Sequence, residues 1–264
     1  MPRAIVTRPA KEAQVWVDQL RARGIGALAL PLITISAANP QALHLAWEKL
    51  GQYDAVMFVS GNAVRHFFAQ RPSQGPSPFN AACPTLRAWV TGPGSYAALV
   101  SSGVDAFLID APTLADGRFD SESLWARVRS KVVPGMRLLV VRGSSVGDDA
   151  TPQGVGRDWL AQQFSSAGGA VDYVVAYERQ PPVWQEAQIA LIADAATDGS
   201  VWIFSSAEAV AYLRASLPQQ SWSQARALAT HARIAQAVRQ IGFGQVLESR
   251  PVLDDVVASI ESIA

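Results

Sequence analysis

Small and hydroxyl-bearing residues recur where a short apolar run gives way to a helical pattern. The stretch MFVSGNAV at 57–64 is echoed by IFSSAEAV at 203–210, and in both a serine separates the apolar run from the helix. Such residues cap helices through their side-chain oxygens. The N–H groups at a helix start also attract anions. Several such turns directed at one place would suit a ligand with many negative charges.

The candidate binding residues share a position just after, or at the end of, an expected strand. They are Arg8, Ser60, Gly61, Asn62, Gly92, Ser95, Arg142, Ser205, Ser206, Ala207 and His231. For each serine alone, helix capping is the simpler interpretation, so the functional interpretation depends on the whole set. Tyr177 is of another kind, because a phenol at a strand end can donate a proton as a mild acid.

Other chemistries are less well supported. TGPGSYA at 91–97 follows a strand as a dinucleotide-binding turn would, with Asp110 at the distance of a ribose-binding acid. However, Pro93 removes one N–H and the turn lies deep in the chain. No serine–histidine–aspartate arrangement can be read from the spacing. The single cysteine, Cys83, forms no metal-binding cluster with histidines, so we expect neither a metal nor a cofactor.

Composition bounds the class of protein. The chain has 264 residues, of which 49% are hydrophobic, which predicts a globular protein of one large or two medium domains. The formal net charge is zero and no basic block occurs, which disfavours nucleic acid as a partner. No signal peptide or apolar run of membrane-spanning length is visible. We therefore expect a cytoplasmic protein with no membrane partner.

The elements that must position these residues alternate along almost the whole chain. Short apolar runs followed by helical patterns predict an α/β fold whose parallel sheet is covered on both faces. Ligands bind beyond the C-terminal ends of such strands. The expected strands are 3–7, 27–35, 54–60, 86–92, 105–109, 136–143, 170–178, 200–206, 226–230 and 244–249. The helices fall between them, and a last one is expected at 252–262.

The strand–helix units form an internal repeat. IVTRP at 5–9 resembles LVVRG at 139–143, and the segment 92–103 resembles 231–242 in register and in its closing glycine. The chain therefore reads A–B–A′–B′, where A is a strand–helix–strand unit and B holds the serine-bearing strand and its successors. This order predicts two related lobes. A could pack with B. Alternatively, A could pack with B′ if the two long extended stretches, 27–36 and 171–181, are paired crossovers.

Together these motifs resemble the uroporphyrinogen-III synthase family, the cofactor-free cyclases of tetrapyrrole biosynthesis. The resemblance covers nearly the full length through VTRP (6–9), FVSGNAV (58–64), TGPGSYAALVSSG (91–103), VVRG (140–143), VVAYER (174–179), FSSAEAV (204–210) and the helix 231–242. It implies two similar lobes, each a parallel sheet flanked by helices, joined by a two-stranded antiparallel linker. The lobes would be 1–35 plus 178–264 and 38–173, with linkers at 36–37 and 174–177.

The resemblance also implies a reaction. Hydroxymethylbilane, a linear tetrapyrrole with eight carboxylates, would bind in a cleft and lose its terminal hydroxyl as water. The resulting azafulvene attacks ring D, and a spiro intermediate recloses with that ring inverted to give uroporphyrinogen III. Tyr177 matches the family's tyrosine that assists departure of the hydroxyl. Arg8, Ser60, Asn62 and Ser206 match cleft positions.

Two departures from the family pattern concern the helix starts. Ser95 stands where the family often has threonine, which keeps the hydroxyl. His231 and Ile234 replace a glycine-to-threonine pattern, so a side-chain contact to a carboxylate is lost at Ile234 and His231 could replace it. A second hypothesis is a cytoplasmic two-lobed module that binds tetrapyrroles or other anions without turnover. In either case we expect a monomer, with the preceding pathway enzyme as a candidate transient partner.

Overall fold

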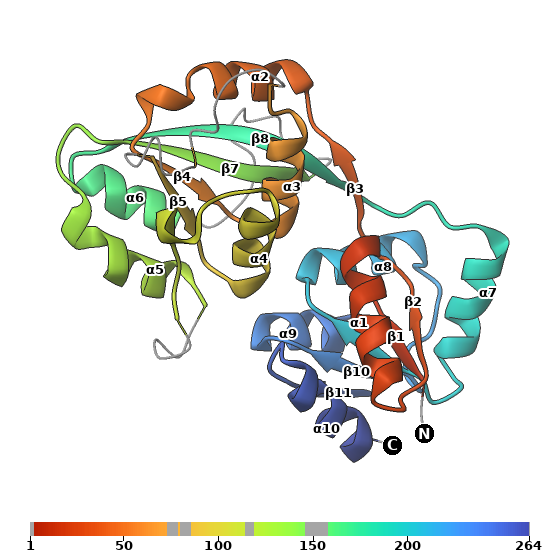
Figure 1. Ribbon diagram of the computed structural model, residues 1–264. Coiled ribbons are helices and arrows are strands. Elements are labelled where there is room, and N and C mark those ends of the chain that lie inside the picture. Colours follow the sequence, from red (N-terminus) through yellow and green to blue (C-terminus); the bar gives the residue numbers. More distant parts are fainter. Residues whose placement is uncertain (1–2, 73–78, 80–85, 114–118, 146–157, 264) are drawn as a thin grey trace. The chain divides into compact units, whose positions relative to one another are not determined.

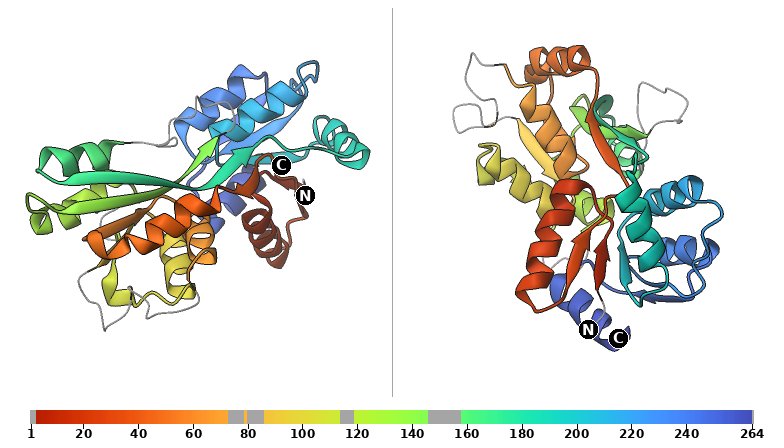
Figure 2. Two further views of the ribbon diagram at one scale, coloured as in Figure 1. Left: turned by 90° about the horizontal axis from the view of Figure 1, so that it is seen from above. Right: turned by 90° about the vertical axis from the view of Figure 1, so that its right-hand side faces the viewer.

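The chain forms two compact units, shown in the computed structural model of Figure 1. The structure describes residues 3–72, 79, 86–113, 119–145 and 158–263. Unit 1 comprises Met1–Ile35 and Gln180–Ala264, and unit 2 comprises Ser36–Arg179. Figure 2 shows from two further sides that helices lie on both faces of each sheet. None of the described helices combines the length and the apolar character that crossing a membrane requires.

Unit 1 contains a five-stranded sheet in which all neighbouring strands are parallel. Its order is β11-β10-β9-β1-β2, so strands from the two ends of the chain meet where Ile5 lies beside Trp202. The strands are β1 (Ala4–Val6), β2 (Ala27–Ala29), β9 (Val201–Phe204), β10 (Arg226–Ala229) and β11 (Gln245–Glu248).

Both faces of this sheet are buried because successive strand residues point to opposite sides. Val6 and Ile203 pack under α1 (Ala10–Ala22) and α10 (Leu253–Ile263). Trp202 and Phe204 stack on each other on the opposite face. That face is covered by α7 (Glu186–Ala195), α8 (Ala207–Ser216) and α9 (Ala232–Gln240).

Unit 2 contains a six-stranded sheet of order β3-β8-β7-β4-β5-β6, parallel from β8 to β6. The residues expected as linkers lie in β3 and β8, which are neighbours in this sheet, and the Ala38 N–H donates to the Ala176 carbonyl at 3.4 Å. The strands are β3 (Thr34–Ala37), β4 (Ala55–Phe58), β5 (Arg87–Val90), β6 (Ile109–Asp110), β7 (Arg137–Ser145) and β8 (Ala170–Gln180).

The helices of unit 2 are held by two different cores. On one face the aromatic rings of Trp47, Phe58 and Phe67 pack together, and the Trp47 Nε1–H donates to the Phe67 carbonyl at 2.9 Å. The helices on this side are α2 (Pro40–Glu48), α3 (Gly61–Ala69) and α4 (Pro93–Ser101), which packs against α3. On the other face Met57 and Val140 pack under α5 (Ser121–Val128) and α6 (Trp159–Ser166).

The structure confirms the predicted α/β class and corrects two of the expected strands. The run 105–109 is mostly a short 3-10 helix (Ala106–Leu108), in which the Leu108 N–H bonds back to the Asp105 carbonyl at 2.9 Å. Phe107 is 57% exposed there, so this apolar run does not form a buried strand. The stretch 27–35 is also interrupted, because Pro31 cannot donate to a strand ladder.

Candidate active site

Tyr177 lies at the C-terminal end of β8 within a small polar network. Its hydroxyl oxygen lies 3.1 Å from the Ser60 Oγ, and the Arg179 Nη1 donates to it at 3.4 Å. The Arg179 guanidinium also lies 5.8 Å from the centre of the phenol ring, and the His66 ring stacks on it at 5.9 Å. Ser60 also caps α3, because its Oγ accepts the Ala63 N–H at 3.1 Å. The network therefore joins the ends of β4 and β8 to the start of a helix.

A β-bulge sets the direction in which Tyr177 points. Arg142 pairs with Val175, but the next pair is Gly143 with Tyr177, so Ala176 is an extra residue in β8. Strand side chains alternate between faces. If residues 175–177 alternated regularly, Tyr177 would lie on the same face as Val175. The bulge turns it onto the opposite face, toward Ser60.

Gly143 gives the Tyr177 ring the space it occupies. A Cβ at position 143 would lie 2.6 Å from the Tyr177 Cε2 and 2.9 Å from the Cε1, closer than real contacts allow. Two residues further along β7, the Ser145 Oγ accepts hydrogen bonds from the Arg179 Nε at 3.2 Å and Nη2 at 3.0 Å. The phenol and the guanidinium are thus both held against the end of β7.

Arg142 lies on the other face of the same sheet. Its side chain is 4% exposed, and its Nη1 donates to the Asp158 Oδ1 at 2.7 Å. Its guanidinium also covers the Tyr173 ring at 4.3 Å. Burial raises the pKa of Tyr173 and the Asp158 charge adds to this, while Arg142 opposes both. The structure therefore does not bring Arg142 together with Tyr177.

These groups line a cavity of about 200 Å³ beneath α5 and α6. Apolar side chains form much of its wall, and a few polar groups converge on it. The lining residues are Met57, Val59, Thr91, Ser121, Val140, Arg142, Asp158, Leu160, Ala161 and Tyr173. This cavity is a second polar site of unit 2, separated by the sheet from the network around Tyr177.

The candidate residues at the helix starts of unit 2 differ in how their side chains are used. Gly61 and Asn62 are the first residues of α3, and the Asn62 Oδ1 accepts a hydrogen bond from the Arg65 Nη2 at 2.7 Å. α4 is capped by Gly92, which has no side chain to accept an N–H. Ser95 is buried in the first turn of that helix, not at its cap.

In unit 1 the candidate residues follow three adjacent strands, β10, β9 and β1. Ser205 precedes Ser206, which caps α8 by accepting the Ala209 N–H at 3.4 Å, and Ala207 is the first helical residue. His231 caps α9 in the same way, since its Nδ1 accepts the Arg233 N–H at 3.1 Å. Both side chains thus work as helix caps.

Arg8, after β1, has an unusual environment. Its guanidinium lies over the Trp16 ring at 4.8 Å. Burial lowers the pKa of Arg8, and the negative charge of Glu12 raises it by a smaller amount. Its Nε is buried and has no hydrogen-bond partner among the described residues. A buried donor of this kind is costly to leave unpaired. Ile234 contributes to the core of unit 1 instead.

Sequence reasoning missed three residues of the Tyr177 network. They are His66, Gly143 and Arg179, none of which is among the candidate residues of the sequence analysis. Arg179 had a usable signal, because residues two apart in a strand share a face. Gly143 had none, since its pairing with Tyr177 depends on the bulge.

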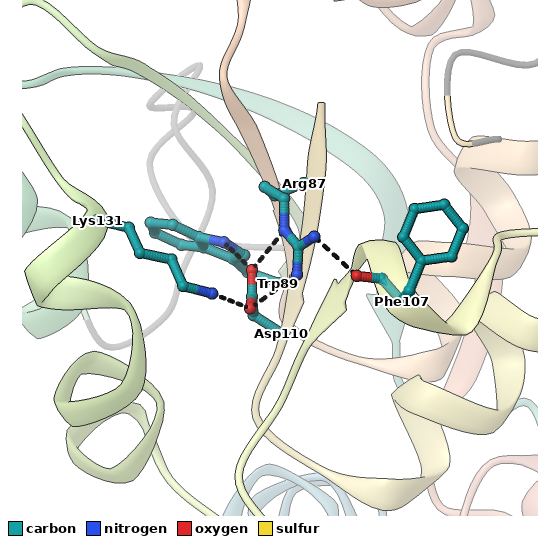
Figure 3. Close-up of polar contacts among 5 residues, drawn as sticks. All are labelled: Arg87, Trp89, Phe107, Asp110 and Lys131. Atoms are coloured by element: carbon teal, nitrogen blue, oxygen red, sulfur yellow. Dashed lines mark hydrogen bonds and ion pairs between the residues drawn. The ribbon is translucent and has the colours of Figure 1, made fainter. Parts of the chain in front are cut away.

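Asp110 does not act as a ribose-binding acid, because its carboxylate is already occupied (Figure 3). It accepts from the Arg87 Nε and Nη2, both at 2.9 Å, from the Lys131 Nζ at 2.8 Å and from the Trp89 Nε1 at 3.2 Å. Burial alone raises the pKa of Asp110, but the hydrogen bonds from Arg87 and Lys131 outweigh it and lower that pKa. This cluster ties β6 to β5.

Metal-binding side chains are not gathered in the part of the chain that the structure describes. No group of three or more histidine, cysteine, aspartate or glutamate residues there is placed to hold an ion. Cys83 lies outside the described residues.

Comparison with known proteins gives consistent matches. The family described as uroporphyrinogen-III synthase HemD matches residues 14–258. A uroporphyrinogen-III synthase of Chlorobaculum parvum is 26% identical over 191 residues, covering 71% of this chain and 68% of that protein. The uroporphyrinogen-III synthetase of Helicobacter pylori has a TM-score of 0.59 at 13% identity, with both chains fully covered. A mutant Thermus thermophilus uroporphyrinogen III synthase has a TM-score of 0.56 at 15% identity, covering 100% of this chain and 98% of that one.

Proposed function

The chain belongs to the uroporphyrinogen-III synthase family, and we propose that it closes hydroxymethylbilane through the groups around Tyr177. Members of this family are enzymes that cyclise this linear tetrapyrrole in haem biosynthesis. The terminal hydroxyl leaves as water, ring D is inverted, and the product is uroporphyrinogen III. The remaining question is which residues of this chain do the work.

We propose that Tyr177 protonates the departing hydroxyl. The observation that carries this role is the pair of contacts from Ser60 and Arg179 to its hydroxyl oxygen. The electron-rich pyrroles of the substrate drive ionisation, so a mild acid is enough. A phenol meets this need without a second catalytic group.

We propose that the substrate carboxylates bind to helix starts and to two arginines. The first N–H groups of a helix have no carbonyl partner inside it, and each exposed anion contact there contributes roughly 0.3–1 kcal/mol. Arg8 supports this proposal through its unpaired buried Nε. The proposed binding residues are Arg8, Ser60, Gly61, Asn62, Gly92, Ser95, Arg142, Ser205, Ser206, Ala207 and His231.

The enzyme must favour the inverted product over a competing closure that needs no enzyme. Holding the flexible chain in the conformation that forms the harder bond is an effect of proximity and orientation. The test is to incubate the protein with freshly made hydroxymethylbilane and to separate the product isomers. We expect the type III isomer. Type I alone would show binding without turnover and would support a non-catalytic tetrapyrrole-binding module.

Replacing Tyr177 by phenylalanine tests the proposed acid. General acid catalysis contributes roughly 10²–10⁴-fold to a rate, and we expect Tyr177→Phe to lower type III formation by at least about tenfold. Loss of the two hydrogen bonds to the hydroxyl should cost only about 1–3 kcal/mol of unfolding free energy, which thermal unfolding would measure. A variant that keeps full activity would remove Tyr177 from the reaction.

Further proposals concern the protein as a whole. We propose that units 1 and 2 serve as its two domains, that it works as a cytoplasmic monomer, and that its partner is the small-molecule substrate rather than nucleic acid or a membrane. The zero formal net charge supports the choice of a small-molecule partner. Because hydroxymethylbilane is unstable, we also propose transient contact with the preceding enzyme. Sedimentation velocity of the protein alone would test the monomer, and sedimentation with the preceding enzyme would test the transient complex.

A further inference from the structure

We infer that Ser60 and Arg179 form a donor pair on the hydroxyl oxygen of Tyr177, so that the phenol's own proton is directed to the substrate. The inference rests on the proposed role of Tyr177 and deepens it. Both residues would be positioning residues, because they act through the phenol. It assigns Arg179, which was not among the candidate site residues, a part in the chemistry.

The hydrogen-bonding capacities of the three groups carry this inference. A guanidinium can only donate, so the 3.4 Å contact from Arg179 uses a lone pair of the Tyr177 oxygen. The Ser60 Oγ already accepts the Ala63 N–H at 3.1 Å and retains its own proton to donate. When Ser60 donates across its 3.1 Å contact, both partners of the phenol are donors. Its proton is then left for another acceptor.

The same arrangement stabilises Tyr177 after the proton has gone. A phenolate accepts hydrogen bonds more strongly than a phenol, and a guanidinium donor adds the attraction of its positive charge. Ser145 fixes the guanidinium through its Nε and Nη2, so its Nη1 is already oriented. Donors that gain strength as charge develops lower the barrier more than they stabilise the starting state.

The step balances without a co-reactant. The phenol O–H bond breaks and its proton joins the substrate's hydroxyl oxygen. The C–O bond then breaks, water leaves, and the electron pair of the pyrrole nitrogen forms a protonated azafulvene, whose positive charge is balanced by the phenolate of Tyr177. Ring closure finally releases a proton from the attacked pyrrole carbon, and this proton restores the phenol of Tyr177.

Substitutions at Arg179 test the inference through separate values of kcat and KM. We expect Arg179→Met to lower kcat for type III formation about tenfold, the scale of one hydrogen bond to a charged group, with KM changed less than about twofold. Arg179→Lys should recover part of kcat because it restores the charge. An Arg179→Met variant that raises KM at unchanged kcat would show carboxylate binding instead and would overturn the inference.

The double variant separates this inference from the proposed function. If Arg179 acts through the phenol, Arg179→Met should cause no further loss of kcat in a Tyr177→Phe background. Multiplying losses would overturn the inference while leaving Tyr177 as the acid. A fully active Tyr177→Phe protein would overturn the proposed function itself.

Ser60 needs a control because it also caps α3. Asp120 caps α5 of the same unit in the same way, with its Oδ1 accepting the Ser123 N–H at 2.8 Å. We expect Ser60→Ala and Asp120→Ala to lower the thermal midpoint similarly, but only Ser60→Ala to lower kcat, by about tenfold. Equal kcat values for the two variants would remove Ser60 from the donor pair.

Discussion

Tyr177 stands where a side chain at position 143 would otherwise lie. A glycine inside a strand usually weakens it, and its presence often marks a close approach by another group. Here the approaching group is the phenol ring itself, and Ser60 holds the hydroxyl at its far end. The position of the proposed acid therefore depends on the smallest residue of the neighbouring strand.

Adding one methyl group at this position should displace the ring. We expect Gly143→Ala to lower the rate of type III formation to about that of Tyr177→Phe, and overpacking to reduce the unfolding free energy by about 1–3 kcal/mol. Gly51→Ala is the matched control, because a Cβ there meets nothing within 4 Å and lies in the same unit. An isomer assay with both variants checks this. Full activity of Gly143→Ala would show that the ring position is unimportant.

At the scale of elements, most of the fold could be predicted from the sequence. Buried parallel strands are apolar throughout, and helix starts carry a recognisable residue type, so their alternation is visible. The predicted capping by Ser60 and Ser206 is confirmed by hydrogen bonds to backbone N–H groups. The prediction was wrong for the short segment 105–109, which is mostly apolar but forms a 3-10 helix at Ala106–Leu108.

The surroundings of Tyr177 could not be predicted, and the reason lies in one strand. Regular alternation along β8 places Tyr173 and Tyr177 on the same face, beside Arg142. The extra residue, Ala176, moves Tyr177 to the other face, and nothing in its residue type announces a bulge. The sequence therefore indicated the candidate groups but not which of them share a site.

The cluster around Asp110 holds an edge strand of two residues, β6, and makes its stability depend on pH. Because the pKa of Asp110 is lowered in the folded state, its contribution is full above the pKa of an unfolded aspartate, about 3.9, and is lost as pH falls through the lowered value. We expect Asp110→Asn to cost about 1–3 kcal/mol at pH 7. Denaturant unfolding at neutral and acidic pH should show this cost shrinking in acid. A constant difference would contradict the role of the charge.

At the scale of the whole molecule, the proposed chemistry draws only on the chain's own groups. One phenol supplies the proton, and backbone N–H groups and arginines receive the carboxylates. We therefore expect extensive dialysis against EDTA, followed by gel filtration to remove nucleotides, to leave the rate of type III formation unchanged. Loss of activity that added metal or nucleotide restores would contradict this account of the reaction.

The internal repeat could not predict that strands from the two ends of the chain pair in one sheet. The repeat is equally compatible with A packed against B and with A packed against B′. The choice is made by strand neighbours, and β1 lies between β2 and β9 in unit 1. Such neighbours are set by long-range contacts that leave no trace in local residue spacing.

This order of strands has a consequence for how the protein is made. When β1 and β2 leave the ribosome, β9 has not yet been synthesised, and the whole of unit 2 must emerge first. At about 5–20 residues per second, the wait between Ile35 and Val201 is roughly 10–30 s. The apolar first strand remains without its central partner throughout that interval, while unit 2, continuous in sequence, can already fold. In the nascent chain, β1 and β2 are therefore the segment most exposed to aggregation. Unit 1 is completed only when the last quarter of the chain has been synthesised.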